Sequence, residues 1–154
     1  MVRRLFHEGM NDLIALTHEA LDSSYLMSLG VSDEEGVWVA DVIFVHDDEF
    51  SVYWMSSVNR RHSLAIVKNP NVAAAITATM RPGEPDRGVQ MSGVAEVIDS
   101  VPREIVVKHF RKRNKPEPAG DFVVLEDHQW YVLRPTRIEL IDEVHFGYDR
   151  QRVR

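Results

Sequence analysis

The 154-residue sequence predicts a mainly β domain, built as an antiparallel barrel or sandwich. Six or seven runs of similar length, rich in β-branched and aromatic residues, follow one another and are separated by compact turn compositions. Strands do not alternate with long helical segments, so a parallel sheet of the Rossmann type is not expected. Because we find no internal repeat and no low-complexity linker, we expect residues 1–154 to form a single domain.

Composition argues against several functional classes. The chain carries 18 Lys and Arg against 24 Asp and Glu, a net charge of −6 that argues against a general nucleic-acid binder. It contains no cysteine, which excludes disulfides, thiolate zinc sites, iron–sulfur clusters and cysteine nucleophiles. No apolar run approaches the roughly 20 residues of a membrane-spanning helix, and the first residues lack a signal-peptide core. We therefore expect a cytoplasmic protein that binds neither nucleic acid nor membrane.

The first elements are a helix and three strands. The segment "MNDLIALTHEALDSS" places its apolar residues on one side of a helical wheel, with Asn11 or Asp12 as the N-cap. Three strands then follow at about 25–31, 37–45 and 50–55, separated by the turn compositions "DEEG" and "HDDE". Because these turns are short, we expect neighbouring strands to form antiparallel hairpins.

The second half adds a short helix, two strands, a further helix and a terminal pair of strands. The short helix in "RRHSLAIVKNP" cannot continue past Pro70. "NVAAAITATM" and "GVQMSGVAEVID" read as strands, and Gly93 in the second indicates a bulge or a close backbone approach. "VPREIVVKHFRKR" predicts a helix with Pro102 in its first turn. "QWYVLRPTRIELIDEV" predicts two short strands with a kink at Arg134 and Pro135.

Motifs for metal binding, nucleophilic catalysis and nucleotide hydrolysis are absent from the sequence. The seven histidines are scattered without the spacing of a zinc motif, and "HDDE" lacks the alternating oxygens and the glycine of a calcium loop. The sequence contains neither a GxSxG elbow nor a GxxxxGKS phosphate loop. We therefore predict no metal site, and the sequence identifies no catalytic residue.

The stretch "SSVNRRH" is the candidate binding site. An anion there would meet the hydroxyls of Ser56 and Ser57 and the backbone N–H groups at a helix start. The guanidinium of Arg61 and the imidazole of His62 would add charge-assisted contacts, whereas Arg60 is expected to face solvent. The alternative is a basic helix start that simply faces water. Because the strand "VYWMSS" runs directly into this turn, a flat ligand lying along the strands would place its phosphate at the turn.

Taken in order, these segments resemble the pyridoxamine 5′-phosphate oxidase-like family of flavin-binding split barrels. The resemblance rests on "GVWVADVIFVHDDEFSVYWMSSVNRRHSLAIVKNPNVAAAIT", followed by "GVQMSGVAEVID" and "WYVLRPTRIELID", over roughly residues 22–142. The family shows a strand pair, a Ser-rich basic turn, a helix ending at Asn-Pro, a Gly-x-Ala-Glu-like strand and an Arg-Pro-x-Arg segment in this order. The resemblance implies a six-stranded antiparallel split barrel of the Greek-key type. It also implies a homodimer with FMN held between the subunits.

The resemblance further implies which residues contact the cofactor. Arg61 and His62 match the basic pair that binds the phosphate, and residues 41–44 match the strand that runs along the isoalloxazine ring. Gln90, whose amide is suited to the edge of a heterocycle or else is an exposed strand residue, falls on the strand facing the ring. Trp130 lies where the partner subunit often contributes an aromatic residue. The predicted cofactor-binding set is Asp41, Val42, Ile43, Phe44, Trp54, Met55, Ser56, Ser57, Arg61, His62, Gln90 and Trp130.

The function predicted on this basis is an FMN-binding oxidoreductase that acts on an unidentified small molecule, with the cofactor performing the hydride or electron transfer. The alternatives are a non-catalytic flavin- or haem-binding protein for storage, sensing or haem handling, and a deazaflavin-dependent reductase. The oxidase proper has basic residues on the strand equivalent to 41–45 and a C-terminal signature containing Trp and Arg. Here these segments read "DVIFV" and "EVHFGYDRQRVR", so oxidation of pyridoxamine 5′-phosphate is not expected.

Overall fold

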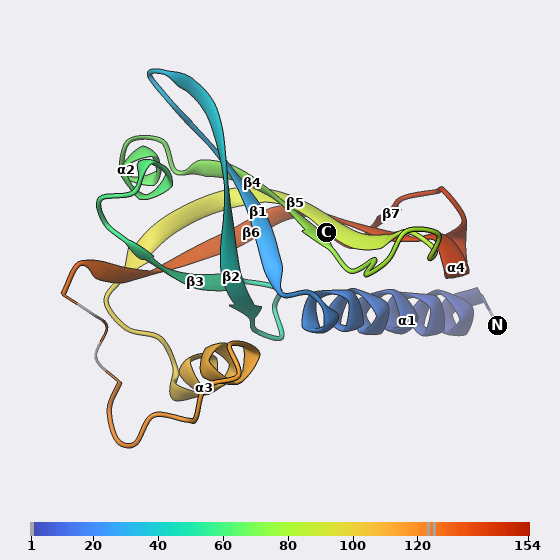
Figure 1. Cartoon of the computed structure of the whole chain (residues 1–154). Coiled ribbons are helices and arrows are strands. Elements are labelled where there is room, and N and C mark those ends of the chain that lie inside the picture. The colour runs from blue at the N-terminus through green and yellow to red at the C-terminus, as the bar shows by residue number, and fades with distance from the viewer. Residues whose placement is uncertain (1, 123, 125) are drawn as a thin grey trace.

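The elements of the protein are defined in a computed structural model that describes residues 2–122, 124 and 126–154, with side chains from residue 12 onward. In these residues a long N-terminal helix and several shorter helices are interspersed among antiparallel strands (Figure 1). The elements in order are α1 (Val2–Ser23), β1 (Leu26–Asp33), β2 (Gly36–His46), β3 (Val52–Ser57), α2 (Arg61–Lys68), β4 (Asn71–Thr77), β5 (Arg87–Ile98), α3 (Arg103–Lys112), β6 (His128–Asp142), α4 (Glu143–Phe146) and β7 (Gln151–Arg152).

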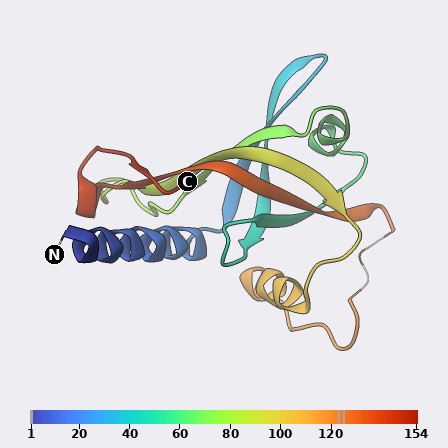
Figure 2. The same ribbon diagram turned by 180° about the vertical axis from the view of Figure 1, so that it is seen from behind.

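Six of the strands close into an antiparallel barrel. Their order is β3-β2-β1-β4-β5-β6, and pairing between β3 and β6 closes the ring. Strands β1 to β3 form consecutive hairpins, and β4 returns to pair with β1, which is the Greek-key arrangement. The predicted mainly β, six-stranded antiparallel barrel is confirmed. The two-residue strand β7 adds to the far end of β6. Figure 2 shows the barrel from behind, where the long strands β5 and β6 curve side by side.

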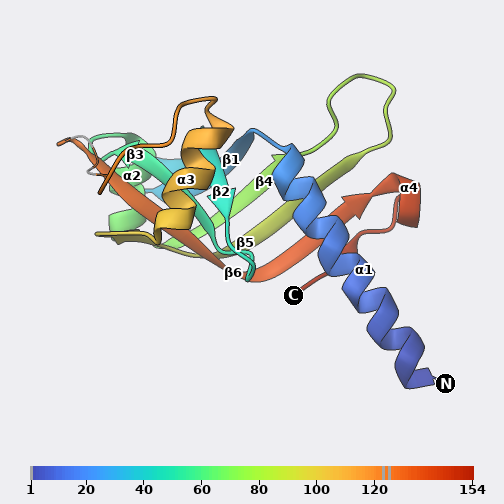
Figure 3. The same ribbon diagram turned by 90° about the horizontal axis from the view of Figure 1, so that it is seen from below.

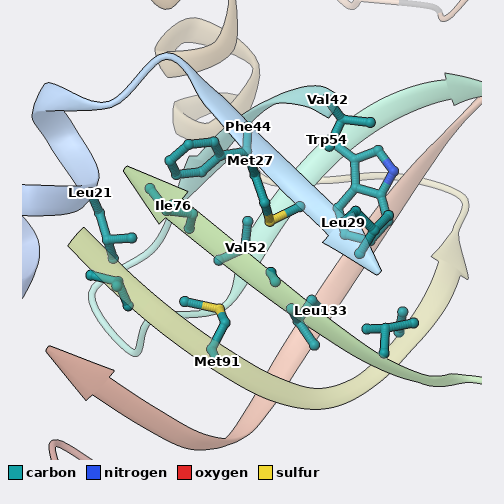
Figure 4. Close-up of a cluster of buried hydrophobic side chains, with 14 of the residues drawn as sticks. Leu21, Met27, Leu29, Val42, Phe44, Val52, Trp54, Ile76, Met91 and Leu133 are labelled. Atoms are coloured by element: carbon teal, nitrogen blue, oxygen red, sulfur yellow. The ribbon is translucent and has the colours of Figure 1, made fainter. Parts of the chain in front are cut away.

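Alternation along the strands fills the barrel with apolar side chains. In β4, "NVAAAIT", every second residue is buried, as expected of a strand with one face inside. Figure 4 shows Met27, Leu29, Phe44 and Trp54 pointing into the same interior from β1, β2 and β3, and all four are fully buried. A second, smaller cluster lies between the barrel wall and α3; it contains Val45, Tyr53, Ile105, Val106, Trp130 and Val132.

The helices cover different parts of the barrel. α1 and α3 lie on the same side, as the view from below shows (Figure 3), with α1 against β5 and α3 against β2. α2 packs against β1 near the projecting β1–β2 hairpin. Because Leu21 at the end of α1 is fully buried in the core, the expected amphipathic helix is present. It begins at Val2, so residues 11 and 12 lie within the helix, and the predicted N-cap is wrong.

None of the helices among the described residues is long and apolar enough to cross a membrane.

The C-terminal segment forms one strand, where the sequence predicted two. β6 continues through Pro135 because the β5–β6 register shifts between Ser92 and Gly93, directly opposite the proline. A β-bulge accommodates a residue that cannot donate a ladder hydrogen bond. Gly93 makes this possible, since a Cβ at that position would lie 2.1 Å from the Arg134 carbonyl oxygen. The predicted close approach at Gly93 is confirmed, and the predicted break in the strand is wrong.

Candidate functional site

A cleft of about 720 Å³ opens where β2 and β3 separate. The two strands pair only between Phe44–His46 and Val52–Trp54; β2 otherwise pairs with β1, and β3 continues along β6. Figure 1 shows β3 between α2 and α3, which supply further walls together with the loop after α3 and the start of β6. The volume lies within the range of small-molecule and cofactor sites. The lining residues are Leu26, Asp41, Val42, Ile43, Met55, Ser56, Ser57, Arg60, His62, His109, Phe110, Arg113, Phe122, Asp127 and His128.

One wall of the cleft is the main-chain edge of β2. Residues 41–43 pair with β1 on one side, and in the part of the chain that the structure describes no strand pairs with them on the other. Alternate N–H and C=O groups of this edge therefore have no ladder partner, although main-chain polar groups require one from protein, water or ligand. A planar heterocycle with donors and acceptors on its rim is suited to such an edge.

The polar end of the cleft is the turn between β3 and α2. Ser56 and His62 are both 8% exposed, and a hydrogen bond of 2.8 Å joins Ser56 Oγ to His62 Nε2. Burial lowers the pKa of His62, and the nearby charge of Arg60 lowers it further. His62 is therefore neutral near pH 7. The cationic charge at this end comes from Arg60, which makes no ion pair with any described carboxylate.

Arg61 lies outside this cleft. Its Nε and Nη2 atoms donate to the two carboxylate oxygens of Asp33 at 2.7 and 2.9 Å, and its guanidinium stacks 4.7 Å from the ring centre of Trp38. The hydrogen bond from Arg61 lowers the pKa of Asp33, so this pair remains ionised. Arg60, which the sequence expected to face solvent, therefore lines the cleft, and Arg61, which it expected at the phosphate, pairs with the acidic β1–β2 hairpin of its own chain.

The opposite wall of the cleft comes from α3. His109 is 3% exposed, and the edge of its ring packs on Trp130, with 5.3 Å between ring centres. Burial, followed by the charges of Arg113 and Lys112, lowers the pKa of His109 to about 4. Phe110 meets the nearby Phe122 edge to face at 4.9 Å. These residues form a mostly apolar wall with a neutral imidazole.

An Asp–His pair lies beside the polar turn. His128 Nδ1 lies 2.7 Å from Asp127 Oδ1, and this hydrogen bond lowers the pKa of Asp127. The Val58 N–H donates to the main-chain oxygen of Asp127 at 2.8 Å, which joins the pair to the β3–α2 turn. His128 thus lies next to Ser57, its partner on the β3–β6 ladder.

Known sequences match this chain only in part. No protein-family model matches the chain. A UPF0306 protein of Photorhabdus laumondii is 29% identical over 84 residues, a match that covers 54% of this chain and 57% of the relative. The match therefore spans little more than half the length of that curated relative.

Solved structures match over most of the chain. A proposed pyridoxamine 5′-phosphate oxidase from Listeria innocua superposes with a TM-score of 0.62 at 14% identity, covering 86% of this chain and 97% of its own. A haem-binding protein from Mycobacterium smegmatis gives 0.66 at 20% identity, covering 91% and 57%. An F420 reductase gives 0.59 at 23%, covering 79% and 94%. The chain has the pyridoxamine 5′-phosphate oxidase-like split-barrel fold.

The split barrel brings most of the predicted strand and turn residues into one cleft, but not all of them. Phe44 and Trp54 point into the barrel core, and Trp130 is buried in the smaller cluster. Gln90 lies in a separate hollow with Met91, Ser92, Arg137 and Glu139. The predicted residues that line the cleft are Asp41, Val42, Ile43, Met55, Ser56, Ser57 and His62.

Sequence reasoning missed the walls that come from distant segments of the split barrel. Apart from Leu26 on β1 and Arg60 in the β3–α2 turn, these residues carry no motif, and only the packing of α3 and the start of β6 against β2 and β3 brings them together. The basic C-terminal end of the helix in "VVKHFRKR" was the one local signal for part of this wall. The missed residues are Leu26, Arg60, His109, Phe110, Arg113, Phe122, Asp127 and His128.

Proposed function

We propose that this split barrel is a flavoprotein that binds FMN in the cleft and acts as an oxidoreductase on a small molecule. The observation that carries the proposal is that one cleft joins an unpaired main-chain edge, residues 41–43, to a cationic turn at the start of α2. A flavin has the matching chemistry, because its ring rim alternates donors and acceptors and its side chain ends in phosphate. FMN, when bound, supplies the hydride or electron transfer.

The turn between β3 and α2 is suited to a phosphate. Arg60 occupies the N-cap position of α2 and makes no side-chain capping hydrogen bond, so the first N–H groups of the helix lack an acceptor within it. Such a helix start favours an anion. Ser57 and Arg60 add a hydroxyl and a guanidinium from the same turn, while neutral His62 orients the hydroxyl of Ser56.

The remaining cleft residues would orient the ring and exclude water. Met55 and Val42 lie on the two diverging strands, and Phe110 and Phe122 cover them from α3 and the loop that follows it. His109 is neutral because its pKa is near 4, so it places no charge against an apolar ring system. Arg113 also lines the cleft and adds a positive charge that would favour a second, anionic molecule.

Haem is the second candidate ligand, and a specific observation favours it. The imidazoles of His62, His109 and His128 all line the cleft, and imidazole is a common axial ligand of haem iron. A solved structural neighbour is itself a haem-binding protein. FMN remains the first choice because it would use both the unpaired main-chain edge at residues 41–43 and the cationic turn, whereas haem would use the imidazoles alone, of which His62 is already engaged by Ser56. A deazaflavin would use the same main-chain edge.

The outer face of the sheet supports a homodimer. Asp41, Ser28, Ala75 and Gln90 form one row across β2, β1, β4 and β5, and their side chains are small or partly exposed. A row of small and partly exposed side chains next to the cleft suits face-to-face packing of two copies. We propose that this packing brings Gln90 of one subunit toward the cleft of the other, which explains its position outside the cleft of its own chain.

Titration of the apoprotein with FMN, riboflavin, FAD and haemin tests this function. We expect FMN to bind at least about tenfold more tightly than riboflavin, because only FMN reaches the cationic turn with a phosphate. Sizing of the apo and flavin-loaded protein should give a dimer that flavin stabilises. Equal affinity for riboflavin and FMN would contradict a phosphate-anchored site. Tight binding of haemin with a Soret band, and weak binding of FMN, would establish the second candidate instead.

A further inference from the structure

We propose that His128 is a phosphate ligand that makes the cleft selective for a terminal phosphomonoester over a phosphodiester; this rests on the proposed FMN site. His128 and Ser57 are direct partners on the antiparallel β3–β6 ladder, so their side chains lie on the same face, with Cβ atoms about 4.5–5.5 Å apart. Both line the cleft together with Arg60. The side chains of Arg60 and His128 therefore converge at its polar end, where the hydroxyl of Ser57 hydrogen-bonds Asp127.

Asp127 fixes the ring of His128. Its Oδ1 atom lies 2.7 Å from Nδ1, and the side chain of His128 is 34% exposed at the cleft. Nε2 makes no hydrogen bond to any described residue, so it is the ring nitrogen open to a ligand. The main-chain bond from Val58 to Asp127 holds the pair at a fixed position relative to Ser57 and Arg60.

Charge decides what kind of ligand this pair accepts. Asp127 is ionised, and it would repel a phosphate unless the imidazole carried a proton on each nitrogen. Arg60 supplies a cation beside the pair, and the other cleft carboxylate, Asp41, is engaged by the hydroxyl of Ser28 at 2.6 Å. Bound phosphate would therefore lie between the guanidinium of Arg60 and Nε2 of His128.

The number of donors explains the selectivity. A phosphomonoester presents three terminal oxygens, which would face Arg60, His128 and the first N–H groups of α2. Each phosphorus in the pyrophosphate of FAD has only two terminal oxygens and leaves one of these donors without a partner. An unpaired donor in a partly closed site costs binding free energy. We therefore expect FMN to bind more tightly than both riboflavin and FAD.

The test titrates FMN, riboflavin and FAD into matched variants, and loss of His128 should shrink the preference for FMN over FAD as well as over riboflavin. His128→Phe keeps the ring shape and removes both N–H groups; we expect it to lower FMN affinity by about tenfold and leave riboflavin affinity unchanged. Asp127→Asn should also lower the FMN-to-riboflavin affinity ratio, because the ring loses its anionic partner. The control is His145→Phe, since His145 also pairs with a carboxylate, Asp142, at 2.9 Å but lies outside the cleft. It should retain the wild-type ratio.

The outcomes separate this proposal from the proposed function. If wild-type protein does not distinguish FMN from riboflavin, the proposed phosphate-anchored FMN site is wrong, and the role proposed for His128 is wrong as well. If wild-type protein does distinguish them and His128→Phe keeps the same ratio, His128 is no phosphate ligand, although the FMN site stands. A haemin Soret band that disappears in His128→Phe would make His128 an iron ligand and would overturn the proposal.

Discussion

The two adjacent arginines in "NRRH" should respond differently to substitution by alanine: Arg60→Ala should weaken FMN binding, and Arg61→Ala should lower the stability of the fold. Arg60→Ala removes the cleft guanidinium and breaks no ion pair with a described residue. Loss of a charge-assisted contact to phosphate costs about 1.5–3 kcal/mol, which corresponds to a ten- to hundredfold weaker FMN affinity. Arg61→Ala removes the two-point contact to Asp33 and the stacking on Trp38, both outside the cleft. We expect it to lower the melting temperature and change FMN affinity by less than about threefold.

The assay is a fluorescence titration of each apoprotein with FMN and riboflavin, together with thermal unfolding of the apo forms. Arg60→Ala should weaken FMN but not riboflavin, and it should unfold at the wild-type temperature. Arg60→Lys should recover only part of the loss, because an ammonium lacks the planar two-point geometry of a guanidinium. The reverse pattern, in which Arg61→Ala weakens FMN and Arg60→Ala has no effect, would refute the assignment of the phosphate to Arg60.

Two further predictions concern the folded state. Because burial lowers the pKa of His109 to about 4, the unfolded chain takes up this proton first as pH falls, so stability should drop by about 2 kcal/mol between pH 7 and pH 5. His109→Phe should flatten that slope in urea unfolding, and an unchanged slope would contradict the burial argument. Gly93→Ala places a Cβ 2.1 Å from the Arg134 carbonyl oxygen and should destabilise the barrel by at least about 1–3 kcal/mol. Gly30→Ala meets only Ala73 O at 3.4 Å and should unfold near the wild-type temperature, so equal melting of the two variants would refute the close approach.

The strands were predictable from the sequence because their signal is local. Alternation in "NVAAAIT" and the turn compositions around "DEEG" and "HDDE" depend on neighbouring residues, and the structure places strands there. The same holds for Ser56, Ser57 and His62, whose positions follow from the end of β3 and the start of α2. The break predicted at Pro135 was wrong because its reason is not local: Gly93, on another strand, provides the bulge that accepts the proline.

The cleft could be predicted only in part, because partners far apart in sequence decide which side chains face it. Arg60 and Arg61 are chemically identical, and the choice between them depends on Asp33, which lies 28 residues before Arg61. His109 and His128 carry no motif, and they reach the site because α3 packs on β2 and because β6 pairs with β3. Three-dimensional packing, rather than residue type, therefore decides which residues line the cleft.

The β2–β3 ladder stops early, and this leaves a main-chain edge on β2 that is suited to a planar ligand. Complete pairing of β2 with β3 would satisfy the main-chain groups of residues 41–43 and would leave no cleft. Instead β3 turns to pair with β6, which closes the barrel but leaves this edge of β2 to solvent or ligand. A heterocycle that fills the gap would supply the missing partners and would add apolar contact with Met55 and Phe110. Because such a ligand binds only the folded chain, it would also stabilise the barrel against unfolding. A ligand at this unpaired strand edge would thus link its own binding to the stability of the barrel.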